Sequence, residues 1–302
     1  MAALNVAVDN PATIEDIAPA SPMVDLMGGS NRRQIQVHEF GFVALVDVMP
    51  RLAPAGQTAD SAIVQAARVS YGAGTKKVNE DRGLIRYLLR HRHTTPFEMV
   101  EFKFHVAMPI FIARQWIRHR TANVNEYSAR YSLVPDRFYA PTRDDVRAQS
   151  VLNRQGGDEP IDDETAGAFA DYLEKAESLH EDYLKLTERG LARELARIGL
   201  PQSVYTEWYW KIDLHNLLHF LSLRLDSHAQ KEIRDYAEAM LRLVEPIVPM
   251  TIEAFRDYRL GAVSLTRLEV EAIRSGADKL ATKNTREQRE WEEKRSSLGL
   301  DR

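Results

Sequence analysis

The sequence of 302 residues contains no cysteine. This absence excludes disulfides, iron–sulfur clusters, zinc sites with sulfur ligands and catalysis by a thiolate nucleophile. Long apolar runs are also missing, since no window approaches the roughly 18 uninterrupted apolar residues that suggest a membrane-spanning helix. The segment before the first basic residue, Arg32, has neither the charged start nor the apolar block of a signal peptide. We therefore expect a cytoplasmic protein that makes no membrane contact.

An excess of charge of one sign is missing as well, because 40 Lys and Arg residues oppose 44 Asp and Glu residues for a formal net charge of −4. This balance excludes a polycation that binds nucleic acid through its overall charge. Hydrophobic residues make up 44% and charged residues 28% of the chain, as in ordinary soluble globular proteins. A chain of this length can bury roughly three quarters of the surface that its unfolded form exposes, so we expect a sizeable core.

Composition divides the chain into a main region and three peripheral segments. Residues 1–32 are small, acidic and punctuated by proline, and we expect them to form a disordered leader. We expect residues 33–275 to form a single domain, interrupted near 141–163 by a polar, flexible insert that contains glycine and proline. The remainder, 276–302, is a charged tail in which we expect a solvated helix or disorder.

Hydrophobic periodicity predicts a mixture of strands and helices. Alternation of apolar and polar side chains is strictest in Val100–Met108, and shorter extended segments are expected at Arg33–Val37 and Gly41–Val48. The sequence Thr95-Pro96-Phe97-Glu98 predicts a helix start that is capped by Thr95. Helical spacing predicts helices over 61–70, 80–91, 110–120, 164–189, 192–198, 204–225, 228–244 and 251–258. We therefore predict an α+β fold with a small, mostly antiparallel sheet packed with helices and a helical second half.

The segment most typical of a binding site is Arg114–Arg130, in which four arginines and His119 share 17 residues with a single acid, Glu126. Such a density of positive charge is destabilised by self-repulsion unless an anion or buried carboxylates offset it. The planar guanidinium group suits phosphate, so a phosphate-bearing ligand is the natural candidate. A solvated basic face is the simpler alternative, but Trp116 and Tyr127 interleave with the charges.

A specific motif lies within this segment. Arg118-His119-Arg120 is followed after seven residues by Ser128, in the context NEYSARYS. With AARVSYG at 66–72, HRHTTPFE at 91–98 and the segment 194–234, this pattern resembles the flavin-dependent thymidylate synthase family and its signature RHR-x7-S. The resemblance covers roughly residues 38–140 and 165–260 and omits the leader, the insert and the tail.

Members of that family make thymidylate (dTMP) from deoxyuridylate (dUMP). They take a methylene group from 5,10-methylenetetrahydrofolate and a hydride from reduced FAD, which NADPH regenerates. The resemblance therefore implies FAD and NADPH as cofactors, dUMP and a folate as small-molecule substrates, and a homotetramer whose active sites lie between subunits. The other class of thymidylate synthase depends on a cysteine that adds to the uracil ring, and this chain contains no cysteine.

The resemblance also implies roles for individual residues. Arg224 matches the catalytic arginine, which favours ionisation at N3 of the uracil and so raises the electron density of the ring carbon. The residues that match cofactor-binding positions are Ser70, His93, Thr95, Arg118, His119, Arg120, Glu126, Asp213, Leu214, His215, His219 and His228. The residues that match dUMP-binding positions are Gln115, Trp116, Ile117, Arg118, Glu126, Tyr127, Ser128, Ala129, Arg130, Arg197 and Arg224.

Spacing gives an additional argument, because Asp213 and Arg224 are 11 residues apart, about three turns of a helix at 3.6 residues per turn. In the helix expected over 204–225 they share one face, which a ligand could span. The resemblance also suggests that this helix, which is apolar around much of its circumference, buries a face against a neighbouring subunit. Many relatives have asparagine at the positions of Asp213 and His219. An aspartate there can accept from ribose hydroxyls but is a poor neighbour for phosphate.

Other roles remain open for these residues. Arg224 could form a buried ion pair with Asp226 or with a partner subunit, and Arg197 could cap the end of its helix. Nucleic-acid binding is an alternative function, with Trp116 and Tyr127 stacking on bases, although the net charge argues against it. A flavoprotein with a different acceptor is a third possibility.

Two pairs of histidines are spaced so that they could bind a metal ion. His91 and His93 are separated by one residue, and His215 and His219 are spaced by one helical turn. No HExxH pattern accompanies either pair, and an isolated helical pair is more often packed or hydrogen-bonded than bound to metal. We therefore predict no metal site.

Overall fold

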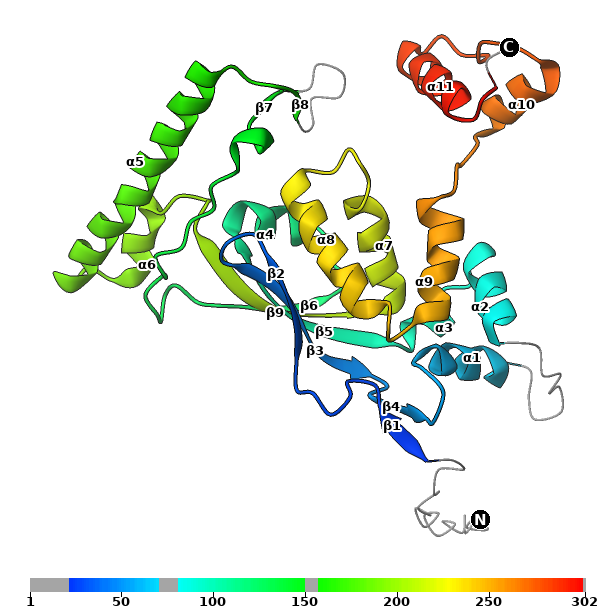
Figure 1. Ribbon diagram of the computed structural model, residues 1–302, viewed down its shortest axis with the longest axis horizontal. Coiled ribbons are helices and arrows are strands. Elements are labelled where there is room, and N and C mark those ends of the chain that lie inside the picture. The colour runs from blue at the N-terminus through cyan, green and yellow to red at the C-terminus, as the bar shows by residue number, and fades with distance from the viewer. Residues whose placement is uncertain (1–21, 71–80, 150–156, 301–302) are drawn as a thin grey trace, which may run out of the picture. The chain divides into compact units, whose positions relative to one another are not determined.

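The computed structural model describes residues 22–70, 81–149 and 157–300 (Figure 1). By compactness the chain divides into a first unit, residues 1–255, and a second unit, residues 256–302. The strands described in the first unit are β1 (Met23–Asp25), β2 (Arg33–Val37), β3 (Gly41–Met49), β4 (Leu52–Pro54), β5 (Glu101–Pro109), β6 (Asn123–Glu126), β7 (Arg147–Gln149), β8 (Gly157–Pro160) and β9 (Tyr205–Asp213).

The helices described in the first unit are α1 (Asp60–Val69), α2 (Asp81–Arg90), α3 (Thr95–Glu98), α4 (Ile110–Trp116), α5 (Asp163–Glu188), α6 (Arg193–Ala196), α7 (Leu214–Arg224), α8 (Lys231–Val244) and α9 (Pro249–Phe255), with 3-10 turns η1 (Arg143–Asp145) and η2 (Arg197–Gly199). The second unit contains the short π-helical segment η3 (Arg256–Leu260) and the helices α10 (Arg267–Ser275) and α11 (Thr285–Ser297).

Among the described residues, five strands form the main sheet in the order β2-β3-β5-β9-β6, and every neighbouring pair is antiparallel. Its longest regular ladder joins β5 to β9, from Glu101 opposite Asp213 to Pro109 opposite Tyr205. The strands predicted from the sequence appear as β2, β3 and β5. The prediction of an α+β fold built on a small antiparallel sheet is therefore confirmed.

The prediction of one helix over 204–225 is wrong in its first half. Tyr205–Asp213 is strand β9, and helix α7 begins only at Leu214. The sequence YTEWYWKID alternates with a period of two, so that its tryptophans are buried whereas Tyr209 projects from the opposite face and is 43% exposed. The high apolar content of the segment favoured a helix, but the alternation indicates a strand.

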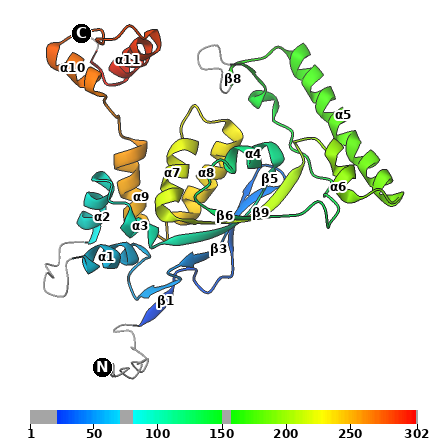
Figure 2. The same ribbon diagram turned by 180° about the vertical axis from the view of Figure 1, so that it is seen from behind.

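Helices α4, α7 and α8 cover one face of the sheet (Figure 1 and Figure 2). Trp116 at the end of α4 is fully buried, and its ring lies 4.9 Å from Phe220 of α7 and 5.2 Å from Trp210 of β9. The hydroxyl of Tyr236 in α8 donates a hydrogen bond to the carbonyl of Ala107 in β5 at 2.9 Å. These buried contacts hold the helical layer against the strands.

Strand and helix lengths bring the C-terminal ends of α4 and α7 together. Helix α4 begins after Pro109 and α7 begins after Asp213, and these two residues lie at opposite ends of the antiparallel ladder. The ladder of nine residues spans about 30 Å at roughly 3.4 Å per residue. Helices of 7 and 11 residues together cover about 27 Å at roughly 1.5 Å per residue. Because both helices run over the same face, their last residues meet.

Helices α1, α2, α3 and α9 form a second group that packs together. The helices predicted over 61–70 and 80–91 appear as α1 and α2. Helix α3 is a single turn in which Thr95 is the first residue, and the cap position is held by Thr94, whose side chain makes no capping bond. The prediction that Thr95 caps a helix is therefore wrong by one position.

Asp60 joins α1 to α9. Its side chain is 1% exposed and accepts hydrogen bonds from the backbone N–H of Met250 at 2.9 Å and from the backbone N–H and hydroxyl of Thr251 at 3.1 and 2.6 Å. Thr58 makes a further bond to the same carboxylate at 3.1 Å. The carboxylate thus supplies acceptors for the first N–H groups of α9, which have no partner within their own helix.

Parts of the leader and of the insert have regular structure. Met23–Asp25 pairs as β1 with β4, and Met27 is 1% exposed, so the disorder expected for the leader does not extend to residue 32. In the insert, β7 pairs with β8, which differs from the flexible segment expected near 141–163. Residues 1–21 and 150–156 lie outside the described residues.

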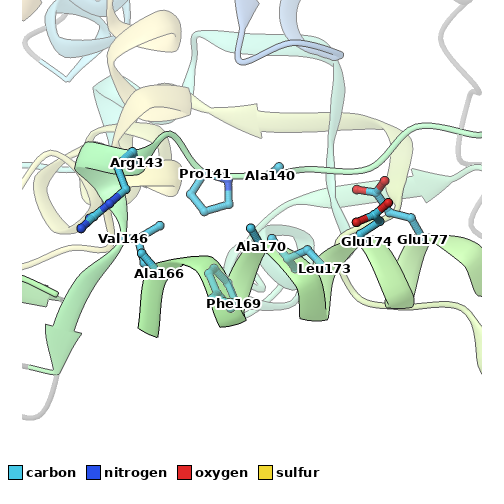
Figure 3. A pocket seen from close by; sticks show the side chains of 10 residues that line it. All are labelled: Ala140, Pro141, Arg143, Val146, Ala166, Phe169, Ala170, Leu173, Glu174 and Glu177. Atoms are coloured by element: carbon cyan, nitrogen blue, oxygen red, sulfur yellow. The ribbon is translucent and has the colours of Figure 1, made fainter. Parts of the chain in front are cut away.

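Helix α5, predicted over 164–189, follows the insert and packs its apolar side against residues 140–146. A pocket of about 280 Å³ lies at this contact. Its lining includes Phe169 and Leu173 of α5 and Pro141, with Glu174 and Glu177 at one end (Figure 3). A neighbouring cavity of about 840 Å³ also borders α5. Neither wall contains a residue that the sequence identified as a ligand contact.

The second unit has a small core of its own. Trp291 of α11 is 1% exposed and packs with Ala272 and Leu280, and its indole N–H donates to the carbonyl of Asp278 at 3.0 Å. The tail contains a largely solvated helix, α11, as expected, but Trp291 is buried and fixes this helix in a small core. The segment belongs to a folded unit that begins at Arg256.

Replacing Asp60 should destabilise the first unit. Asp60→Ala removes four hydrogen bonds to a buried carboxylate and should lower the free energy of unfolding by about 2 to 4 kcal/mol. Asp81→Ala is the matched control, because Asp81 forms an exposed ion pair with Arg68 at 2.7 Å, and losing such a pair costs about 1 kcal/mol or less. Urea unfolding measures both, and equal losses would contradict the role given to Asp60.

Candidate active site

Helix α4 ends at Trp116, so the motif Arg118-His119-Arg120 lies in the turn that follows the helix. The helix is therefore shorter than the predicted segment 110–120. The backbone N–H of His119 donates to the carbonyl of Trp116 at 2.9 Å. Because Trp116 is fixed in the core, this turn is held close to the C-terminal end of α7.

His119 and Arg224 form the central contact of the site. Arg224 is the last residue of α7, and its Nε donates a hydrogen bond to Nε2 of His119 at 3.1 Å. The ring of His119 also lies 4.9 Å from the ring of Phe220 and 6.2 Å from that of His219, both on α7. We call Arg118, His119, His219 and Arg224 the arginine–histidine cluster.

The surroundings of His119 keep its ring neutral. Partial burial is the main cause that lowers the pKa of His119 to about 4, and the positive charge of Arg224 contributes further. A neutral imidazole that accepts at Nε2 carries its proton on Nδ1. Burial also lowers the pKa of Arg224, and the charge of Arg118 contributes, but an arginine remains charged at neutral pH.

Arg118, Arg120, Arg197 and Arg224 take part in none of the ion pairs among the described residues. The alternative in which Arg224 pairs with Asp226 is wrong for this chain, because the imidazole of His228 lies 2.8 Å from the Asp226 carboxylate, which also accepts the backbone N–H of His228. Guanidinium groups without carboxylate partners favour anionic ligands. Of the positive charges noted in Arg114–Arg130, those of Arg118 and Arg120 are therefore not neutralised by any carboxylate among the described residues.

A second group of candidate residues lines a pocket of about 330 Å³, which we call the Ser128 pocket. Its wall contains five residues that match dUMP-binding positions, Glu126, Tyr127, Ser128, Ala129 and Arg197. The rest of the wall is mainly apolar and consists of Ile110, Val134, Leu200, Val204, Tyr205 and Thr206. No member of the arginine–histidine cluster lines this pocket.

Hydrogen bonds fix the loop that carries Ser128. The hydroxyl of Tyr127 donates to the carbonyl of Leu133 at 2.7 Å. The Oγ of Ser128 accepts the backbone N–H of Arg130 at 3.4 Å, which leaves its own hydroxyl hydrogen available to a ligand.

Three residues that the sequence analysis missed hold candidate residues in place. Gln230, just before α8, accepts a hydrogen bond from the side chain of Gln115. Glu194 accepts from Nε of Arg130 at 3.2 Å, and the hydroxyl of Thr206 donates to Glu126 at 2.8 Å. Their partners are 64 to 115 residues away in the chain, so no local motif could have identified them.

Three of the predicted contact residues have structural side chains. Asp213 precedes α7 and caps it, accepting from the backbone N–H of Asn216 at 2.9 Å and from its side-chain amide at 2.7 Å. Asp213 therefore lies at the N-terminal end of α7 and Arg224 at its C-terminal end, and the side chain of Asp213 is engaged in capping. Leu214 and Trp116 are 0% exposed, so any contact that they make to a ligand must be through the backbone.

The other predicted cofactor residues are accessible. Those that are exposed are Ser70, His93, Thr95, Arg118, Arg120, Glu126, His219 and His228, while His215 is half-buried. Among the dUMP residues, Ile117 is 45% exposed. In the part of the chain that the structure describes, no hydrogen bond or ring contact joins Ser70, His93 or Thr95 to the arginine–histidine cluster.

Two kinds of feature are absent from the described residues. No group of three or more His, Cys, Asp or Glu side chains there is arranged to hold a metal ion. None of the described helices has the length and apolar character needed to cross a membrane.

Known proteins resemble this chain along most of its length. The family model described as "Thymidylate synthase complementing protein" matches residues 51–250. A flavin-dependent thymidylate synthase of Dictyostelium discoideum is 65% identical over 285 residues, covering 94% of each chain, and one of Gluconobacter oxydans is 54% identical over 265 residues, covering 85% of each. The crystal structure of a UMP/dUMP methylase from Streptomyces cacaoi bound with 5-Br dUMP is 35% identical with a TM-score of 0.63, covering 74% of this chain and 98% of that one.

The pH dependence of stability should report the state of His119. Folding lowers its pKa from 6.5 to about 4, so the unfolded chain takes up the proton first as the pH falls. The folded protein therefore has its full stability, as far as His119 is concerned, above pH 6.5. It loses stability progressively as the pH falls from 6.5 to about 4.

His119→Gln should remove that part of the pH dependence. Urea unfolding at a series of pH values measures it, and His91→Gln, which changes an exposed histidine outside the cluster, serves as the control. If His119→Gln kept the wild-type dependence, His119 would not be held neutral in the folded protein.

Proposed function

Because the chain belongs to the thymidylate synthase complementing protein family, we propose that it is a flavin-dependent thymidylate synthase. It converts dUMP to dTMP, takes the one-carbon unit from 5,10-methylenetetrahydrofolate, and uses FAD and NADPH as cofactors. The observation that carries this proposal is that Arg118, Arg120, Arg197 and Arg224 have no ion-pair partner among the described residues. Both dUMP and FAD bear phosphate, for which such groups are suited.

The Ser128 pocket supports dUMP as the substrate. A nucleotide phosphate is bound well by short donors and by guanidinium groups that no carboxylate neutralises. The pocket offers the Ser128 hydroxyl, the backbone near Ala129 and the side chain of Arg197. The related methylase was solved with 5-Br dUMP bound.

Arg224 is the catalytic residue of the proposed reaction. Its charge lies in a partly buried position, where electrostatic interactions are stronger than in water. Aimed at the uracil ring, the guanidinium stabilises the negative charge that develops when N3 loses its proton. This raises the electron density of the ring carbon that takes the new group.

The residues of the arginine–histidine cluster and its neighbours fit FAD. Arg118 and Arg120 are close in sequence and exposed, and neither forms an ion pair in the part of the chain that the structure describes. Two such guanidinium groups suit a diphosphate. His119 and His219 add hydrogen-bonding groups beside them. When bound, the reduced flavin supplies a hydride, which makes a cysteine nucleophile unnecessary in a chain that has none.

Ser128 acts in binding and not as a nucleophile. In the described part of the chain, neither a histidine nor a carboxylate forms a hydrogen bond with its hydroxyl, and its partner there is the backbone N–H of Arg130. A serine without an adjacent base is a weak nucleophile.

We also propose that the active sites form between the subunits of a homotetramer. The Ser128 pocket and the arginine–histidine cluster share no lining residue, which supports a site completed by a second chain. Near the pocket in sequence, Tyr131, Leu195 and Ile198 are 73%, 55% and 76% exposed, and clustered exposed apolar side chains are typical of interaction surfaces.

The alternatives have less support. Nucleic-acid binding relied on Trp116 and Tyr127 as stacking groups; Tyr127 is 40% exposed, but Trp116 is buried in the core. A flavoprotein with a different acceptor shares the cluster but does not require the Ser128 pocket, so binding of dUMP separates it from a thymidylate synthase.

The first test of the function is cofactor binding. Protein saturated with FAD should show a flavin spectrum that NADPH bleaches. Arg118→Ala should weaken FAD binding because it removes a cation that no carboxylate among the described residues neutralises. Arg143→Ala is the matched control, since Arg143 is paired with Asp163 at 2.5 Å and lies outside the cluster. Folded protein that binds no FAD in equilibrium dialysis would refute the proposal.

The second test separates binding from catalysis. Ser128→Ala should weaken dUMP binding by about 1 to 3 kcal/mol, the scale of a hydrogen bond to a charged group, and keep measurable turnover. Arg224→Ala should lower turnover by roughly a hundredfold to a thousandfold, the typical cost of losing a group that stabilises developing charge. Reduction of FAD by NADPH should persist in both variants.

Single-turnover formation of dTMP at saturating dUMP measures these effects. Complete inactivity of Ser128→Ala with dUMP still bound, together with near-normal Arg224→Ala, would reverse the two roles.

A further inference from the structure

We propose that His119 is a positioning residue that orients the guanidinium group of Arg224 without cancelling its charge. This inference deepens the proposed function and rests on it, because it concerns how the same side chain meets the uracil ring. It assigns to His119 a task separate from contact with the cofactor.

The bonding pattern of Arg224 is the first support. Its Nε is anchored by His119 at 3.1 Å, while its Nη atoms enter no hydrogen bond among the described residues. The inner edge of the group is thus fixed and the outer edge remains available to a ligand. An arginine that is ordered before binding loses less conformational entropy when the ligand arrives.

His119 is itself firmly held, which an anchor requires. Its backbone N–H is bonded to the carbonyl of Trp116 at 2.9 Å, and its ring packs on Phe220 at 4.9 Å. Trp116 and Phe220 are both 0% exposed and stack on each other. The position of the imidazole is therefore set by the core, and Arg224 receives that order through one hydrogen bond.

The charge of the anchor is the second support. The usual acceptor for a guanidinium is a carboxylate, which would neutralise it. The titratable groups that act on His119 and Arg224 here are His219 and Arg118, and neither is an acid. A neutral imidazole accepts the bond and leaves the positive charge available for the uracil ring.

The test compares side chains that keep or change the charge of the acceptor at position 119. His119→Gln keeps a neutral acceptor, His119→Glu supplies a charged acceptor of the same size, and His119→Leu supplies none. His105→Gln is the matched control, since His105 is a half-buried histidine whose ring stacks on Tyr209 on the other face of the sheet. Each protein is assayed as the FAD-loaded enzyme with NADPH, methylenetetrahydrofolate and dUMP.

Wild-type protein must first form dTMP, because a lack of this activity would refute the proposed function itself and would be distinct from a failure of the positioning role. Given that activity, His119→Gln should stay within about tenfold of the wild-type kcat. His119→Glu should lose roughly a hundredfold or more, approaching the loss expected for Arg224→Ala. His119→Leu should also fall by more than tenfold, and His105→Gln should match the wild type.

Two further readouts distinguish positioning from a structural or cofactor-binding role. At saturating FAD, the Gln and Glu variants should differ much more in the rate of dTMP formation than in the rate of FAD reduction by NADPH. The ultraviolet difference spectrum of bound dUMP should show N3 ionising at higher pH in His119→Glu than in His119→Gln. Equal turnover in these two variants, or a loss that follows FAD affinity alone, would overturn the proposal.

Discussion

The antiparallel ladder between β5 and β9 is the constraint on which the site depends. It sends the chain into α4 at one end of the sheet and into α7 at the other, and both helices return over the same face. Since the two helices are together about as long as the strands, their last residues come face to face. A one-residue slip in this register would turn every side chain of β9 to the other face and would expose the indoles that hold α4 and α7 in place.

The site contains positive charges whose repulsion makes the folded protein less stable when no anion is bound. Among the described residues, Arg118, Arg120, Arg197 and Arg224 have no carboxylate partner, whereas Arg130 is bonded to Glu194. At Arg224, partial burial also disfavours the charged form and lowers the pKa. This arrangement stabilises a bound anion more than it stabilises the empty chain. Functional sites are commonly the places where a protein departs from the arrangement that would be most stable.

Much of the fold and of the candidate site could be predicted from the sequence. Strict alternation gave β5, helical spacing gave α1, α2 and α5, and the motif from Arg118 to Ser128 pointed to the two groups of residues that the structure describes. Strand β9 was missed because its apolar residues are so dense that its period of two was overlooked. The bond between His119 and Arg224 joins residues 105 positions apart. Such a contact depends on how two helices meet, and no local pattern contains that information.

The four tryptophans of the chain are divided unequally between the two units. The ring of Trp116 lies 5.8 Å from that of Trp208 and 5.2 Å from that of Trp210, so these three indoles share one environment between the sheet and the helices α4 and α7. Trp291 lies alone in the core of the second unit. The intrinsic fluorescence of the protein is consequently a sum of two signals, one from the layer that supports Arg224 and one from residues 256–302. Emission recorded from a variant that lacks Trp291 would report on the first of these alone.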